Sequence, residues 1–197
     1  MPDVYRDWDA TYTRGTTPWD MGLAEDALVK FVESGLIKPC RTLELGCGHG
    51  NDAIFLAQKG FDVTAVDISK NAIVQAKERA SRAKVSCTFI AEDATDLKSI
   101  IGTFSFVYDR ACFHFVHQER RDLYLKMLRT FLEPGGYFLL IVSSNKDAVQ
   151  GPYQFSEKDI ERLFEKDFNI LRIELITLEQ HKERPTPYLC VMKRKQL

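Results

Sequence analysis

Hydrophobic residues gather in short runs along the chain, and these alternate with longer segments of helical composition. The runs predict strands at 41–45, 61–66, 85–91, 104–108 and 137–142. The longer segments predict helices at 53–59, 72–80 and 118–132, the second of them capped by Ser69. Strands that alternate with helices in this way favour an α/β fold with a doubly wound, mostly parallel sheet.

The last third of the chain extends this pattern. Pro134–Gly136 predicts a turn before the strand at 137–142, and Ser156 with Asp159 predicts a capping box that opens a short helix ending at Glu165. Two further strands are expected at 168–178 and 188–192. No helical segment separates them, so they predict a hairpin whose last strand runs antiparallel.

The helix at 118–132 and the first 40 residues add two more expectations. Helical spacing places Leu123, Met127, Leu128 and Phe131 on the inward face of that helix. Residues 1–40 precede the first strand and are expected to form an N-terminal helical flap or cap. Residues 41–197 then form a Rossmann-like core of seven strands. A chain of 197 residues suits one domain, so we expect a single domain over 1–197 with no separate substrate domain.

Composition and charge exclude several classes of partner. Lys and Arg number 27 against 28 for Asp and Glu, which gives no basic stripe, and we expect no nucleic-acid partner. No apolar stretch approaches the roughly 18 residues of a membrane span, and the N-terminus is too polar for a signal peptide. The five cysteines contain no C-x-x-C pair and are expected to be reduced. These features predict a cytoplasmic protein without membrane contact, as a monomer or weak homodimer.

The clearest chemical signal is the segment Leu43-Glu-Leu-Gly-Cys-Gly-His-Gly50, which ends the first predicted strand. Ligands of doubly wound folds bind beyond the carboxyl ends of the strands. Gly46, Gly48 and Gly50 allow a ligand to approach the backbone closely. Asp67 ends the next strand, where a carboxylate accepts hydrogen bonds from both hydroxyls of a ribose. Together these residues predict a nucleoside-cofactor site.

The details of this segment favour one cofactor. Dinucleotide sites carry G-x-G-x-x-G, whereas here the position of the third glycine is Asn51. No Gly-Lys-Ser or Gly-Lys-Thr follows the turn, which excludes a P-loop. Glu44 would repel a pyrophosphate but suits a cofactor with an amino group and a sulfonium charge. The residues therefore favour S-adenosyl-L-methionine over NAD.

Four segments resemble those of class I S-adenosylmethionine-dependent methyltransferases: residues 43–50, Val66-Asp-Ile-Ser69, Glu92-Asp-Ala94 and Leu132-Glu-Pro-Gly-Gly136. The resemblance implies that Gly46, Gly48 and Gly50 line the methionine end of the cofactor and that Asp67 holds the ribose. It also implies that the adenine ring contacts Ile68, Asp93 and Ala94.

A narrower resemblance lies outside that core. Trp8, Tyr12, Thr17-Pro-Trp-Asp20, Tyr108-Asp-Arg110 and Gly151-Pro-Tyr-Gln-Phe155 are similar to the thiopurine S-methyltransferase and halide/thiol methyltransferase family. The resemblance implies that Trp8 and Trp19 cover the cofactor and that Arg110 lies near the active site. Tyr12 stands where some members have a further Trp. Tyr12, His114 and Tyr153 are predicted to contact the substrate.

We expect methyl transfer by in-line displacement to a small thiol, thiopurine, halide or other soft nucleophile. Such acceptors react without a strong base, so positioning and desolvation supply most of the rate. The predicted catalytic residues are Arg110, which would hold an anionic nucleophile, with Asp109 and Tyr153. Asp109 is also expected at the cofactor, and Asp109, His114 or Tyr153 would help to deprotonate a thiol.

Two alternatives stay open at this stage. The first is a small-molecule N-, O- or metalloid-oxyanion methyltransferase of the same fold, because acceptor choice lies outside the core motifs. The second is an S-adenosylmethionine-binding protein without catalysis. His114 and His117 are three residues apart, but no second cluster completes a metal site, so no metal is expected.

Overall fold

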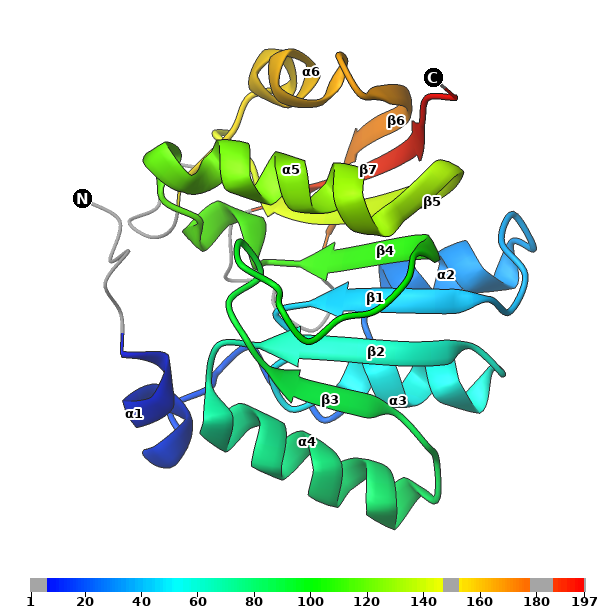
Figure 1. The fold of residues 1–197 in the computed structure, drawn as a ribbon. Helices are drawn as coiled ribbons and strands as arrows, with labels where there is room; N and C mark the ends of the chain where they lie inside the picture. The colour runs from blue at the N-terminus through cyan, green and yellow to red at the C-terminus, as the bar shows by residue number, and fades with distance from the viewer. Residues whose placement is uncertain (1–6, 147–152, 178–185, 197) are drawn as a thin grey trace.

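The structure, a computed structural model, describes residues 7–146, 153–177 and 186–196, and these form one seven-stranded sheet (Figure 1). The strand order is β3-β2-β1-β4-β5-β7-β6. The strands are β1 (Arg41–Leu45), β2 (Asp62–Asp67), β3 (Thr88–Ala91), β4 (Phe104–Arg110), β5 (Leu132–Ser143), β6 (Phe168–Leu175) and β7 (Pro187–Arg194). Neighbours from β3 to β5 pair in parallel, and β7 is antiparallel to both β5 and β6. This confirms the predicted fold.

Helices cover both faces of the sheet. One hydrophobic cluster packs α2 (Asp26–Glu33), α3 (Asn51–Gln58) and α4 (Lys70–Ala83) on one face, and a second packs α5 (Arg121–Phe131) and α6 (Glu157–Phe164) on the other. Successive strand residues point to opposite faces. Val107 of β4 therefore joins the α5 and α6 side, while Phe106 and Tyr108 join the α2 and α3 side.

The first 40 residues divide into two parts. The short helix α1 (Trp8–Thr13) lies at the end of the sheet to which the arrowheads of β1, β2 and β4 point (Figure 1). In α2, Leu28 is fully buried and Phe31 stacks on Phe106 with ring centroids 5.6 Å apart, so α2 belongs to the helical layer of the core. We therefore call residues 8–25 the N-terminal flap.

Two local predictions were wrong. Leu123, expected to face inward, is 45% exposed, whereas Tyr124 is fully buried, because its hydroxyl donates to the buried Asp109. The turn expected at Pro134–Gly136 lies within β5 as a bulge. Leu132 pairs with Phe104 and Tyr137 with Phe106, so the extra residues 133–136 loop out opposite a single residue of β4.

Other local predictions were confirmed. The capping box of Ser156 and Asp159 opens α6, and the Ser69 side chain caps α4. The helix predicted from 118 begins with a 3-10 turn at Gln118–Arg120 before α5. Within the described parts of the chain, no helix has the length and apolar character needed to cross a membrane.

Candidate active site

The turn between β1 and α3 contains glycines whose replacement would strain the backbone. Gly46 and Gly48 have φ values of +68° and +51°, in the left-handed region that favours glycine. A Cβ on Gly46 would lie 2.7 Å from the Cβ of Cys112, and one on Gly48 would lie 2.7 Å from the Tyr12 hydroxyl. The glycines thus let two other segments approach the backbone of the turn. We call residues 46–50 the glycine turn.

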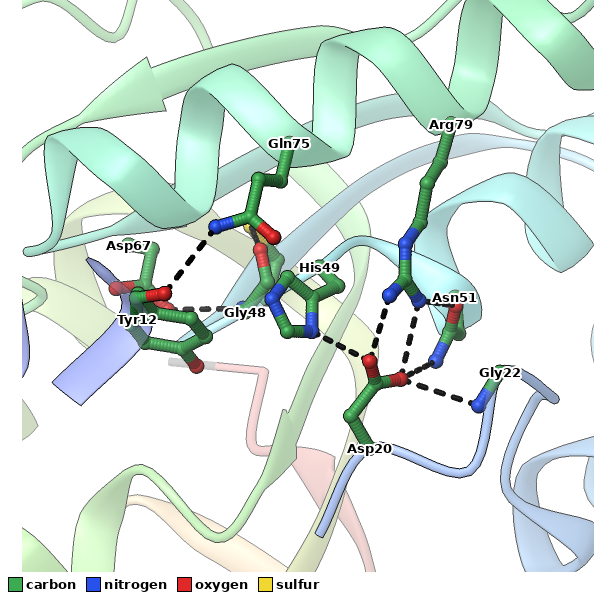
Figure 2. Close-up of polar contacts among 10 residues, drawn as sticks. Tyr12, Asp20, Gly22, Gly48, His49, Asn51, Asp67, Gln75 and Arg79 are labelled. Carbon is green, nitrogen blue, oxygen red and sulfur yellow. Dashed lines mark hydrogen bonds and ion pairs between the residues drawn. The ribbon is translucent and has the colours of Figure 1, made fainter. Parts of the chain in front are cut away.

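Asp67 ends β2 beside the glycine turn and is 7% exposed. Its Oδ2 accepts the backbone N–H of Gly48 at 2.8 Å, shown in Figure 2, and its Oδ1 accepts that of Ser69 at 2.9 Å. Burial raises the pKa of Asp67. Each carboxylate oxygen has two lone pairs, so one on each oxygen is left to accept a ligand hydroxyl.

Glu44 lies two residues before Gly46 and is 3% exposed. Its Oε2 accepts no hydrogen bond from any residue that the structure describes. Burial, reinforced by the charge of Asp52, raises the pKa of Glu44 well above its usual range. A buried acceptor without a donor is costly, and a ligand amino group would satisfy it. The glycine turn, Asp67 and Glu44 therefore fit the shape, hydroxyls and amino group of S-adenosyl-L-methionine.

Aromatic side chains of the flap form a continuous row beside the glycine turn. Trp8 contacts Phe115 and Trp19, with ring centroids 4.8 and 5.9 Å apart. Tyr12 lies 6.2 Å from Trp19 and 5.0 Å from His49 of the glycine turn. The row thus joins the segment after β4 to the segment after β1. Phe115 and His49 were not predicted, although His49 lies inside the glycine motif itself.

The residues expected at the adenine ring lie beyond β2 and β3. Ile68 is 55% exposed, a large apolar side chain left open directly after Asp67. Ala94 is buried. The carboxylate of Asp93 accepts hydrogen bonds from the Thr95 backbone and hydroxyl, and from Arg120 at 2.7 Å. Most of the Asp93 carboxylate is therefore already bonded within the protein.

Arg110 ends β4 and is enclosed by carboxylates that sequence reasoning missed. Its Nε donates to Asp52 Oδ2 at 3.1 Å, and a terminal guanidinium nitrogen lies 3.6 Å from Glu25 Oε2. Asp52 also accepts the Glu25 backbone N–H at 2.7 Å and the Tyr108 hydroxyl at 3.2 Å. The Arg110 side chain is 23% exposed. Its positive charge is thus largely balanced within the protein.

Asp109 is fully buried and accepts hydrogen bonds from the backbone that follows it. Its carboxylate accepts the N–H groups of Cys112 at 2.8 Å and Phe113 at 3.1 Å, and the Tyr124 hydroxyl at 2.5 Å. Burial raises the pKa of Asp109 to about 7. With three protein donors on one carboxylate, this arrangement gives no support to a catalytic or cofactor-binding role for Asp109.

His114 and Tyr153 come together beside the end of β5. The His114 Nδ1 accepts the backbone N–H of Ser143 at 3.1 Å, and its backbone oxygen accepts the N–H of Tyr153 at 2.9 Å. Burial lowers the pKa of His114 to about 3, so its ring is neutral. The guanidinium carbon of Arg121, a residue not predicted, lies 4.7 Å from the centroid of the Tyr153 ring.

The two histidines that sequence spacing brought to notice do not converge. His114 is bonded to Ser143, whereas the Nδ1 of His117 lies 3.7 Å from Glu119 Oε2. Among residues 7–146, 153–177 and 186–196, no three His, Cys, Asp or Glu side chains are arranged to hold a metal ion.

Two relatives show what the chain is similar to. "Probable S-adenosyl-L-methionine-dependent methyltransferase TehB" of Haemophilus influenzae is 27% identical over 151 residues, which cover 75% of this chain and 52% of the relative. "Thiocyanate methyltransferase 1" of Brassica oleracea is 30% identical over 148 residues, which cover 74% of this chain and 65% of the relative. The chain thus spans about half the length of the TehB relative.

Solved structures share the fold. A protein studied for the conversion of a disulfide bond into a thioacetal group during echinomycin biosynthesis has a TM-score of 0.82 and 24% identity, covering 95% of this chain and 92% of that one. The 1,6-didemethyltoxoflavin-N1-methyltransferase of Burkholderia thailandensis, with bound S-adenosylhomocysteine, has a TM-score of 0.81 and 23% identity, covering 98% and 88%. At these identities the likeness extends to the fold.

The family follows from a match along nearly the whole chain. A family profile described as Thiopurine S-methyltransferase (TPMT) matches residues 5–190. This match confirms the resemblance carried by the flap, the glycine turn and the segment after β4. It also confirms, for the family, the predicted methyltransferase class and S-adenosyl-L-methionine as cofactor. The chain belongs to the thiopurine S-methyltransferase family.

Proposed function

We propose that this protein transfers a methyl group from S-adenosyl-L-methionine to a small soft nucleophile such as a thiol, a thiopurine or a halide. The observation that carries the proposal is the glycine turn with Asp67 at its side and the aromatic row of the flap beside it. When bound, the cofactor supplies a methyl group on a sulfonium, whose thioether leaving group needs no proton.

The chain holds the cofactor through groups of known chemistry. The remaining lone pairs of Asp67 accept hydrogen bonds from the ribose hydroxyls, and Glu44 Oε2 accepts one from the methionine amino group. Gly46 and Gly48, whose Cβ positions are filled by Cys112 and Tyr12, give the turn the shape that we propose borders the methionine end. Ile68, Asp93 and Ala94 are proposed to border the adenine ring.

The flap covers the proposed cofactor site at the carboxyl ends of the strands. Trp8 and Trp19 present large aromatic surfaces, which attract a sulfonium cation and exclude water from the reacting atoms. Phe115, at one end of this row, and Tyr12, His114 and Tyr153 are proposed to contact the acceptor. These side chains are mostly aromatic, which suits an apolar or polarisable acceptor.

We assign Arg110 the task of orienting the acceptor. Asp52 and Glu25 fix its guanidinium, and its remaining N–H donors are free of hydrogen bonds to the residues that the structure describes. Neither Asp109, held by three donors, nor the neutral His114 is poised as a strong base. Rate enhancement is therefore proposed to come from positioning and desolvation of an acceptor that is already nucleophilic.

The finer expectations about the whole protein belong to this proposal. We propose a single methyltransferase domain over 1–197, working in the cytoplasm as a monomer or weak homodimer without nucleic-acid or membrane partners. The net charge of -1 supports this setting, because it offers no attraction to polyanions.

The test begins with calorimetric titration of S-adenosyl-L-methionine and, separately, of NAD. We expect binding of the first alone, followed by methylated products when the protein is incubated with thiols, thiopurine, iodide, thiocyanate, selenite and amines and analysed by mass spectrometry. Methylation of amines or selenite alone would favour the N- or oxyanion-methyl alternative. Cofactor binding without any product would favour a non-catalytic binding protein, and no heat at millimolar cofactor would refute the proposal.

The variant Arg110→Ala sharpens the acceptor assignment in the same assay. Its cofactor affinity should stay within about twofold of wild type, while turnover falls, most for anionic acceptors. Unchanged turnover of thiocyanate and iodide would show that Arg110 does not contact the acceptor.

A further inference from the structure

One carboxylate of the flap is bonded to three separate parts of the core. Asp20, 12% exposed at its side chain, accepts hydrogen bonds from Arg79 at 3.0 and 2.6 Å and from the Asn51 side chain at 2.7 Å. Its Oδ2 also lies 2.6 Å from His49 Nδ1, and the backbone N–H of Gly22 donates to it at 3.1 Å. Figure 2 shows these partners converging on the Asp20 carboxylate. We call this group the Asp20 clasp.

We call the glycine turn, with Glu44 and Asp67 beside it, the cofactor cradle. The partners of Asp20 belong to this cradle or to the helices that directly follow its strands. His49 lies in the glycine turn between Gly48 and Gly50, Asn51 is the first residue of α3, and Arg79 belongs to α4. Asp20 itself directly follows Trp19 in the flap. The clasp therefore joins the covering segment to the surface that it covers.

The clasp is strong for physical reasons. The two guanidinium nitrogens of Arg79 bind both carboxylate oxygens of Asp20, a fork geometry that combines charge with fixed direction. Although burial opposes ionisation, the hydrogen bonds from Arg79 and Asn51 hold the pKa of Asp20 below its usual range. The carboxylate is thus charged and fully engaged at neutral pH.

The contacts of Asp20 also determine where the neighbouring aromatic row lies. Trp19 packs against Tyr12 with ring centroids 6.2 Å apart, and the Tyr12 hydroxyl lies 2.7 Å from where a Cβ of Gly48 would stand. Fixing Asp20 against His49 and Arg79 therefore fixes Trp19, and with it Tyr12, over the glycine turn.

A second carboxylate anchors the flap in a different way. Asp9 of α1 accepts the Ser69 hydroxyl at 2.6 Å and the Asn71 backbone N–H at 3.1 Å, at the start of α4. It touches neither the glycine turn nor an arginine in these contacts. Asp9 therefore provides a comparison, a flap aspartate that anchors α1 and reaches the proposed cofactor site only through Ser69, whose backbone N–H donates to Asp67.

We propose that Asp20 is a positioning residue for cofactor binding, whose clasp to His49, Asn51 and Arg79 holds Trp19 and Tyr12 closed over the glycine turn and slows cofactor release. This rests on the proposed function, since it assumes that the cradle takes S-adenosyl-L-methionine. Asp20 acts through its neighbours and is not itself assigned to the reacting atoms.

The test uses the fact that the sequence holds only two tryptophans, Trp8 and Trp19, both in the flap. Selectively excited tryptophan fluorescence therefore reports the flap alone. In Asp20→Asn, acrylamide quenching of the cofactor-free protein should increase, and the affinity for S-adenosyl-L-methionine should fall by about tenfold, mainly through faster dissociation in stopped-flow measurements. Asp9→Asn should change the affinity by about twofold or less.

Arg79→Gln removes the same clasp from the other side and serves if Asp20→Asn does not fold. It should reproduce the loss, and the double variant should lose little more than either single variant, because both remove one interaction. The KM for the cofactor should rise in each, with a smaller change in kcat.

The outcomes separate the clasp from the function. Unchanged cofactor affinity and unchanged quenching in a folded Asp20→Asn would overturn the proposal, and so would an equal loss in Asp9→Asn. If wild-type protein binds no S-adenosyl-L-methionine, the proposed function fails, and with it the cofactor-binding role of Asp20. Quenching of the cofactor-free variants would then still decide whether the clasp closes the flap.

Discussion

Two aspartates lie near the carboxyl ends of the strands that flank β1, and the protein uses them differently. Asp67 ends β2, is 7% exposed and accepts one backbone N–H on each oxygen. Asp109 lies near the end of β4, is fully buried and accepts two backbone N–H groups and a tyrosine hydroxyl. Asp67 therefore has lone pairs left to accept hydrogen bonds from a ligand, whereas the lone pairs of Asp109 are used by donors of the protein itself.

The difference shows that a carboxylate at the end of a strand is not in itself a ligand site. What decides is how many donors the protein directs at it. Asp109 fixes the backbone at Cys112 and Phe113, and Cys112 in turn packs against Gly46. Asp109 therefore acts on the glycine turn indirectly, through Cys112, whereas Asp67 accepts a hydrogen bond directly from the Gly48 backbone of that turn.

The largest effect is expected from Asp109→Ala. It leaves the N–H groups of Cys112 and Phe113 and the Tyr124 hydroxyl buried without an acceptor, so the free energy of unfolding should fall by about 4 kcal/mol. Urea denaturation followed by circular dichroism measures this. Asp62→Ala is the control, because Asp62 is 74% exposed and its loss should cost less than about 0.5 kcal/mol. Equal stability of the two variants would refute the structural role of Asp109.

Asp67→Ala should reverse that pattern. Two hydrogen bonds to the ribose are lost, and the affinity for S-adenosyl-L-methionine should fall by about 100-fold, or about 2.7 kcal/mol. Isothermal titration calorimetry gives the affinity, and urea denaturation should show a smaller loss of stability than in Asp109→Ala. Normal cofactor binding by Asp67→Ala would show that the two aspartates do not differ as described.

The sequence predicted the parts of this site that local pattern determines. The strand at 41–45, the glycine turn and Asp67 follow one another closely, so their placement needs little knowledge of the fold. The parallel pairing of the first five strands then follows from alternating strands and helices. Residues that lie together at the carboxyl ends of neighbouring strands were therefore predictable.

The engagement of Asp109 and Arg110 was not predictable, because it depends on distant side chains. Tyr124 reaches Asp109 only because α5 is rotated so that Leu123 is exposed, a phase that the apolar spacing did not give. Asp52 and Glu25 meet Arg110 from α3 and from the residue before α2. These approaches are set by helix packing across the sheet, which composition and spacing do not encode locally.

The pH dependence of stability gives the smallest effect and the sharpest distinction. Because the folded pKa of Asp109 is about 7, above the usual value of 3.8, the folded protein keeps a proton in this range that the unfolded chain releases. Stability from this group is therefore present at low pH and is lost as pH rises toward 7. Between pH 5 and 7 it should lower the unfolding free energy by about 2 kcal/mol.

The variant Asp109→Asn isolates this contribution, since its amide does not titrate while Asp67 and Glu44 remain in both proteins. Urea denaturation at pH 5, 6, 7 and 8 should give a steeper decline for wild type than for the variant, with the two curves running parallel above pH 8. Parallel curves throughout would mean that Asp109 is ionised across the range. The count of protein donors would then be what distinguishes Asp109 from Asp67.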